Sequence, residues 1–90
     1  MDISSYRSEI DSIDNELITL FCRRMELSAL IAEYKKANGL PIYVPTREQE
    51  ILDSVAKKAG AALAPAVTEL YTLLFQLSKN HQAAHIGKEL

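Results

Sequence analysis

The first 38 residues of this 90-residue sequence contain no proline or glycine, and a helical pattern runs through them from about residue 4 to residue 38. Its apolar side chains recur at gaps that alternate mostly between three and four residues, which is the a/d spacing of a heptad repeat sustained for about four heptads. They are Ile3, Tyr6, Ile10, Ile13, Leu17, Leu20, Leu27, Ile31 and Tyr34. Asn38 and Gly39 supply a left-handed C-cap, and Pro41 prevents the helix from resuming. We therefore predict one very long N-terminal helix.

The length of this helix limits the folds that the chain can adopt. About 34 residues make a helix about 50 Å long, whereas a compact domain of this size has a radius of gyration near 12 Å. The part of the helix that protrudes would expose its apolar seam to water. A second copy of the chain is the simplest cover, so we expect a homodimer.

Two shorter helices follow an apolar connector that spans residues 39–45. Thr46 and Gln49 are spaced as a capping box, which predicts a second helix from Thr46 to about Gly60. Pro65 suits the first turn of a third helix that starts near Ala64 and frays somewhere after His81. Its apolar positions are Val67, Leu70, Tyr71, Leu74, Phe75 and Leu77. With no strand pattern, the fold class is all-α, with three helices per chain.

Composition narrows the functional classes. The hydrophobic fraction of 48% is that of a globular protein, and a formal charge of −2 argues against nucleic-acid binding. No apolar run is long enough for a membrane span, and the N-terminus lacks the features of a signal peptide. Cys22 and two scattered histidines show no metal-ligand spacing. We expect a single domain over residues 1–90, in the cytoplasm, without metal or cofactor.

Several polar residues interrupt the apolar stripes. Arg24 takes an a position between Leu20 and Leu27, and a buried guanidinium requires an anionic partner. Either a carboxylate of the partner chain pairs with it and fixes the register of the dimer, or it binds a ligand. Lys35 lies eleven residues later, about 20° away around the helix, and either joins Arg24 on a small dicarboxylate or stabilises the helix C-terminus.

Arg7 lies about 25 Å before Arg24 along the same helix, so only the Arg7 of an antiparallel partner could join Arg24 at a ligand. The alternative is an ordinary solvated arginine. The start of the second helix carries the positive end of the helix dipole. The positive charge of Arg47 is unfavourable there, whereas the negative charge of Glu48 is favourable. Ser78 and Gln82 continue an apolar stripe and need polar partners, either a ligand or other side chains.

The remaining candidates receive structural interpretations. His81 is interpreted as a packing residue, Cys22 as an outer heptad position, and Tyr34 and Tyr43 as packing residues of the seam and the connector.

The order of these signals resembles the all-helical chorismate mutases over nearly the whole chain. Five segments carry the resemblance. They are Arg7 followed by Ile10-Asp11-Ser12-Ile13-Asp14, Leu17-Ile18-x-Leu20-Phe21-x-x-Arg24, Lys35 eleven residues later, Val44-Pro45-Thr46-Arg47-Glu48-x-x-Ile51-Leu52, and Ser78-x-x-x-Gln82. The resemblance implies an intertwined, domain-swapped homodimer that rearranges chorismate to prephenate.

The same resemblance implies the roles of individual residues. Arg24 and the partner's Arg7 would bind the two carboxylates of chorismate. Lys35 and Gln82 would donate to the ether oxygen. Glu48 would contact the ring hydroxyl, and Arg47 and Ser78 would support the carboxylate end.

One position departs from the family pattern. Relatives often have an aspartate where this chain has Val44, so recognition of the ring hydroxyl would rest on Glu48 or on backbone groups. Two other functions stay open. One is an isochorismate-pyruvate lyase of the same fold, and the other is a non-enzymatic helical dimerisation module, which leaves Arg47, Ser78 and Gln82 without a role.

Overall fold

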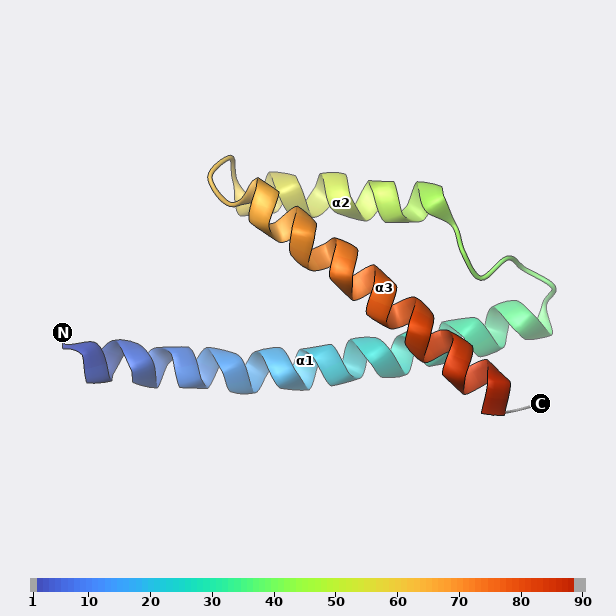
Figure 1. Ribbon diagram of the computed structural model, residues 1–90, viewed down its shortest axis with the longest axis horizontal. Helices are drawn as coiled ribbons and strands as arrows, with labels where there is room; N and C mark the ends of the chain where they lie inside the picture. Colours follow the sequence, from blue (N-terminus) through green and yellow to red (C-terminus); the bar gives the residue numbers. More distant parts are fainter. Residues whose placement is uncertain (1, 89–90) are drawn as a thin grey trace.

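In a computed structural model, which describes residues 2–88, the chain forms three α-helices. They are α1 (Ile3–Ala37), α2 (Pro45–Ala59) and α3 (Ala64–Lys88). Figure 1 shows α3 crossing diagonally from the end of α2 to the C-terminal half of α1. Across the described residues α3 packs against both other helices, while α1 and α2 do not contact each other. The all-α prediction is confirmed, and the predicted bounds of the long helix agree to within about one residue.

The ends of α1 are closed by local hydrogen bonds. At its start, the side chain of Asp2 accepts a hydrogen bond of 3.0 Å from the backbone N–H of Ser5, which makes Asp2 an N-cap that the sequence analysis missed. At its end, Gly39 has a φ of 65°. The N–H of Leu40 donates to the carbonyl of Lys35 at 2.8 Å, and that of Gly39 to the carbonyl of Lys36 at 3.4 Å. These two bonds form a Schellman motif, so the predicted C-cap is confirmed.

The start of α2 differs from the prediction. Its N-cap is Val44, which makes no side-chain cap bond, and Pro45 is the first helical residue. Thr46 therefore lies inside the helix, and the side chain of Gln49 bonds Asp53 at 2.9 Å instead of reaching back. The predicted capping box is wrong, because the fixed φ of proline suits the first helical position and starts the helix before Thr46.

The third helix begins at Ala64 as predicted and continues past His81 to Lys88. His81 is exposed rather than packed, which contradicts its interpretation. The histidine that contacts another helix is His85, whose Nε2 lies 2.6 Å from Oε1 of Glu33 on α1. Steps of three and four residues lead from Ser78 through Gln82 to His85, so the stripe of α3 that faces α1 passes beside His81.

The single chain has a small core. Its buried apolar residues are Met25, Ala29, Ala32 and Phe75, where α1 and α3 cross. The radius of gyration is 16.3 Å and the longest extent is 54 Å, against about 12 Å expected for a compact chain of this size. Most of the apolar seam is exposed, as is Cys22 at its outer heptad position. The exposed seam residues include Tyr6, Ile10, Ile13, Leu17, Leu20 and Tyr34. Among the described helices, none is long and apolar enough to cross a bilayer.

Replacing Gly39 with alanine tests the C-cap of α1. A Cβ at Gly39 would meet nothing within 4 Å, so the cost is that of a non-glycine residue in the left-handed region, about 1 kcal/mol. We expect Gly39→Ala to lower the midpoint of urea unfolding, measured by circular dichroism at one fixed protein concentration.

The matched control is Gly87→Ala, in the last turn of α3, where a Cβ also meets nothing within 4 Å. Alanine is the better helix former there, so this variant should lose no stability. Equal midpoints for Gly39→Ala and the unchanged protein would contradict the C-cap assignment.

Candidate active site

A cavity of about 130 Å³ lies beside the crossing of α1 and α3 and is lined on another side by the connector and the start of α2. Seven of the eight site residues predicted from the sequence line it. They are Arg24, Lys35, Val44, Arg47, Glu48, Ser78 and Gln82. These side chains come from two long helices, the connector and the first turn of α2, so the tertiary fold brings together residues up to 58 positions apart in the sequence.

Arg24 is half-buried, and the partners that the structure describes for its guanidinium are neutral. Its Nη1 donates to Oγ of Ser78 at 3.0 Å, and its guanidinium carbon lies 5.9 Å from the ring centroids of both Tyr71 and Phe75. Within residues 2–88 no carboxylate pairs with Arg24. A hydroxyl and two ring faces hold the guanidinium in place, and its other N–H groups are left for an anion.

Lys35 and Gln82 also keep donors for a ligand. Nζ of Lys35 donates to the backbone carbonyl of Ile42 at 3.2 Å, and Nε2 of Gln82 donates to that of Ser28 at 3.0 Å. An ammonium has three donor hydrogens and an amide nitrogen has two. Each side chain is therefore anchored by one hydrogen bond and retains at least one more donor beside the cavity.

Ser78 and Gln82 point inward and have polar partners, as predicted. Ser78 is 8% exposed, and its Oγ also lies 4.0 Å from the sulfur of Met25. The pair therefore belongs to the contact between α3 and α1, in the stripe where apolar residues would otherwise be expected.

The start of α2 presents two charges of opposite sign. Arg47 is exposed and its Nη1 lies 3.5 Å from Oε2 of Glu50, one turn later. Glu48 is half-buried, and its Oε2 lies 3.2 Å from Nζ of Lys79 on α3. The sequence analysis missed Lys79 because no motif contains it. Lys79 lies four residues after Phe75, which is buried. Residues four apart lie on the same face of a helix, so this spacing could have indicated that Lys79 faces inward.

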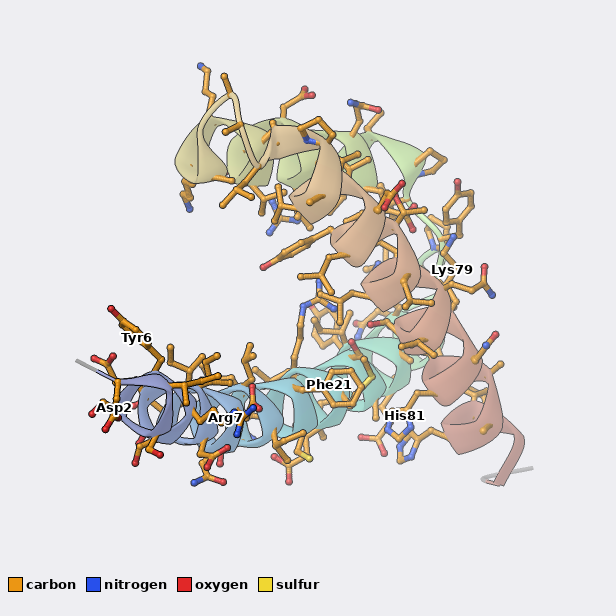
Figure 2. All side chains as sticks on the ribbon, turned by 60° about the vertical axis from the view of Figure 1, so that its left-hand side comes forward. Asp2, Tyr6, Arg7, Phe21, Lys79 and His81 are labelled. Carbon is orange, nitrogen blue, oxygen red and sulfur yellow. The ribbon has the colours of Figure 1, made fainter. Side chains whose placement is uncertain are left out.

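Arg7 is the predicted residue that does not reach the cavity. Its side chain is exposed near the N-terminus of α1, far along the helix from the α3 crossing (Figure 2). Seventeen residues separate it from Arg24, which is about 25 Å along a straight helix. An arginine side chain is too short to span that distance, so the Arg7 of this chain does not join its own Arg24.

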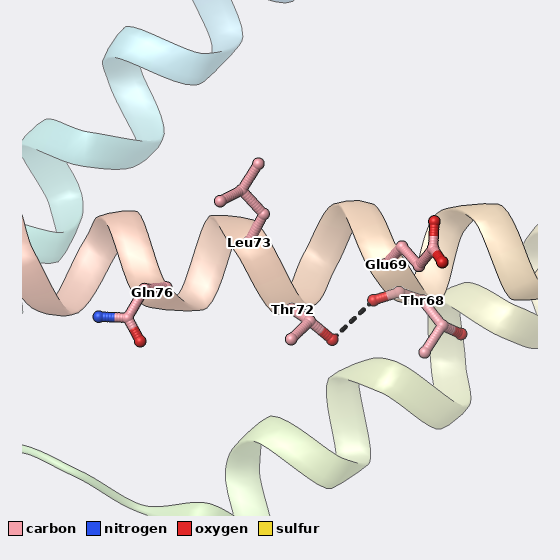
Figure 3. A pocket seen from close by; sticks show the side chains of 5 residues that line it. All are labelled: Thr68, Glu69, Thr72, Leu73 and Gln76. Atoms are coloured by element: carbon pink, nitrogen blue, oxygen red, sulfur yellow. Dashed lines mark hydrogen bonds between the residues drawn. The ribbon is translucent and has the colours of Figure 1, made fainter.

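A second hollow, of about 460 Å³, is larger but lacks convergent polar groups. It is lined by Thr68, Glu69, Thr72, Leu73 and Gln76, all on α3 (Figure 3). Its threonine hydroxyls are used within the helix, since Oγ1 of Thr72 donates to the carbonyl of Thr68 at 2.8 Å. With Glu69 as its one charged residue, this hollow does not suit an anion.

The charges at the smaller cavity indicate the class of ligand. Four of its lining side chains are cationic and one is a carboxylate. The cations are Arg24, Lys35, Arg47 and Lys79. In the described part of the chain no three side chains are grouped as metal ligands. The arrangement suits a small molecule with more than one negative charge, bound by preformed donors.

Comparison with known proteins agrees with this picture. The model of the family described as chorismate mutase type II matches residues 6–83, a range that contains all eight predicted site residues. The chain is 44% identical over 64 residues to the T-protein of Enterobacter agglomerans, which covers 71% of this chain and 17% of that protein.

Two further relatives extend the match. The chain is 30% identical over 95 residues to the bifunctional chorismate mutase/prephenate dehydratase of Aquifex aeolicus, covering 96% of this chain and 26% of that protein. It is 31% identical over 78 residues to the intracellular chorismate mutase of Mycobacterium tuberculosis, covering 87% of this chain and 70% of that protein. The chain thus spans only 17% and 26% of the T-protein and the bifunctional protein.

Proposed function

Because the chain belongs to the chorismate mutase type II family, we propose that it is a chorismate mutase that converts chorismate to prephenate in the biosynthesis of phenylalanine and tyrosine. The observation that carries the proposal is the convergence of Arg24, Lys35, Ser78 and Gln82 on one cavity. Chorismate has two carboxylates and an ether oxygen, which match the cationic and neutral donors there. Residues 1–90 act as one domain, in the cytoplasm.

Each group of donors has a distinct role in this proposal. Arg24 binds one carboxylate and the partner's Arg7 binds the other, with Arg47 and Ser78 supporting that end. Lys35 and Gln82 donate to the ether oxygen, and Glu48 accepts a hydrogen bond from the ring hydroxyl. Support comes from the donors that Lys35 and Gln82 retain beyond their bonds to the carbonyls of Ile42 and Ser28.

The reaction needs no nucleophile. The bond between the ether oxygen and the ring carbon breaks while the enolpyruvyl methylene carbon bonds to the ring, and no proton moves. The protein must hold the reactive conformer and stabilise the negative charge that grows on the ether oxygen. A rate gain of about a million-fold requires about 8 kcal/mol. Loss of one preorganised donor costs about 3–4 kcal/mol, so two or three such donors suffice.

The partner in the proposed homodimer is a second, intertwined copy of this chain. The exposed seam of α1 is continuous with an apolar groove between α1 and α3, which includes Leu17, Phe21, Leu70 and Leu74. Covering apolar surface of this kind stabilises by about 25 cal/mol per Å². An antiparallel α1 of the partner would cover the seam and carry its Arg7 toward the cavity.

The first test is turnover of chorismate by the purified protein in the presence of a chelator, followed by the loss of ultraviolet absorbance and by conversion of the product to phenylpyruvate in acid. We expect rapid turnover, and we expect Arg24→Ala to lower kcat/KM by at least about a thousand-fold. The dimer should survive, as measured by analytical ultracentrifugation.

The matched control is Arg23→Ala. Arg23 is the neighbouring arginine, lies outside the cavity and is exposed, where it pairs with Glu26. This variant should retain nearly full activity, since such pairs contribute little. Turnover of isochorismate alone would replace the proposal with the lyase, which the apolar connector at Ile42, Tyr43 and Val44 would suit. No turnover of either substrate would favour the dimerisation module.

Mixed dimers test whether Arg7 acts across the interface. Arg7→Ala and Arg24→Ala should each be inactive alone. When the two variants are refolded together in equal amounts, half of the dimers are mixed, and each mixed dimer regains one of its two sites. Activity should return to about a quarter of the unchanged protein. No recovery, with mixed dimers demonstrated by mass, would contradict the shared site.

Gln82→Glu tests the donor to the ether oxygen. An amide does not ionise, so the rate of the unchanged protein should be flat around neutral pH. A glutamate donates a hydrogen bond only when it is protonated, so the variant should be active in acid and lose activity as the pH rises. The measurement is kcat/KM from pH 4 to pH 8. A sharp acid optimum in the unchanged protein would rule out this role for Gln82.

A further inference from the structure

Lys79 forms a cluster with Glu48 and Tyr43 in the lining of the cavity. Its Nζ lies 3.2 Å from Oε2 of Glu48 and 4.2 Å from the centroid of the Tyr43 ring. The side chains of Lys79 and Glu48 are 37% and 26% exposed, so both charges are partly removed from water. The three residues come from α3, α2 and the connector, and all three line the cavity. Lys79 is labelled on α3 in Figure 2.

This cluster fixes the charge at the end of the cavity that contains Glu48. Among the described lining residues Glu48 is the one carboxylate, and Val44 beside it is apolar. Glu48 alone would carry a charge of −1. Together with Lys79, whose Nζ lies 3.2 Å away, it forms a pair with a net charge of zero. A neutral hydroxyl can donate to the second oxygen of Glu48 at no electrostatic cost. An ammonium placed there would gain an attraction to Glu48 and meet a repulsion of similar size from Lys79.

We propose that Lys79 is a specificity-determining residue, which makes the site accept a ring hydroxyl beside Glu48 and reject a ring ammonium at the same position. This inference rests on the proposed function, because that function places the ring hydroxyl of the substrate at Glu48. Lys79 acts as a repulsive element against a cationic analogue, while the Tyr43 ring beneath its ammonium holds that charge in place.

The test compares two unreactive bicyclic dicarboxylates that imitate the rearranging substrate and differ only in carrying a ring hydroxyl or a ring amino group. Their dissociation constants are measured by calorimetry at pH 7 and low salt. The unchanged protein should bind the hydroxyl compound at least about tenfold more tightly. Lys79→Met, which keeps the length of the side chain and removes its charge, should reduce this preference to about threefold or less, or reverse it.

Two further variants separate charge from packing. Lys79→Arg keeps the charge and should keep the preference, and Lys79→Gln repeats the neutral substitution with a polar side chain. The matched control is Lys58→Met, in the last turn of α2, which is exposed and outside the cavity and should change nothing. An unchanged preference in both neutral variants of Lys79 would overturn the inference.

Chorismate turnover, measured separately, distinguishes this inference from the proposed function. If the protein turns over chorismate but the neutral variants keep the preference, the role of Lys79 fails and the mutase stands. If no turnover occurs but the preference depends on Lys79, the charge selection at Glu48 stands and the reaction fails. If neither compound binds, both are overturned.

Discussion

The structure depends on a helix that is longer than its own chain can cover. In the 54 Å molecule, α3 crosses the C-terminal half of α1 (Figure 1), and large apolar side chains from Tyr6 to Leu20 face water. The buried core of Met25, Ala29, Ala32 and Phe75 is small for a chain of this length, and small domains are marginally stable even when compact. The same helix carries Arg24 and Lys35. The exposed seam and two of the cations that line the cavity therefore belong to the same helix, so the proposed dimer and the proposed site share one element.

The site keeps positive charge because two of the four cations that line it, Arg24 and Lys35, are held by neutral neighbours. Ser78 and two aromatic rings surround Arg24, and a backbone carbonyl holds Lys35. Partner carboxylates in those places would neutralise the charges that a dianionic ligand needs. The other two cations are paired with carboxylates, Lys79 with Glu48 and Arg47 with Glu50. Positive charge is thus left available at Arg24 and Lys35 and is balanced at Glu48, so the cavity can orient a ligand whose negative groups lie on one side.

The periodicity of the sequence predicted most of this fold and much of the site. Arg24 interrupts the heptad seam, and Lys35 lies near the same line on the helix. Ser78 and Gln82 take positions of an apolar stripe. Spacing alone therefore placed these residues on inward faces. Thr46 and His81 were assigned wrongly, because the choice between neighbouring residues depends on how a helix starts at Pro45 and on how α3 crosses α1. Lys79 was missed for a related reason. A lysine on a helix is usually solvated, and only the approach of α2 gives it Glu48 as a neighbour.

Two consecutive residues of α3 contact two different helices. Ser78 bonds Arg24 on α1, and Lys79 pairs with Glu48 on α2, although α1 and α2 do not contact each other anywhere in the described chain. If α3 turned about its own axis, both contacts would change at once. A substitution that rotated α3 would therefore disturb the support of Arg24 and the pairing of Glu48 at the same time, although the two residues lie on different helices.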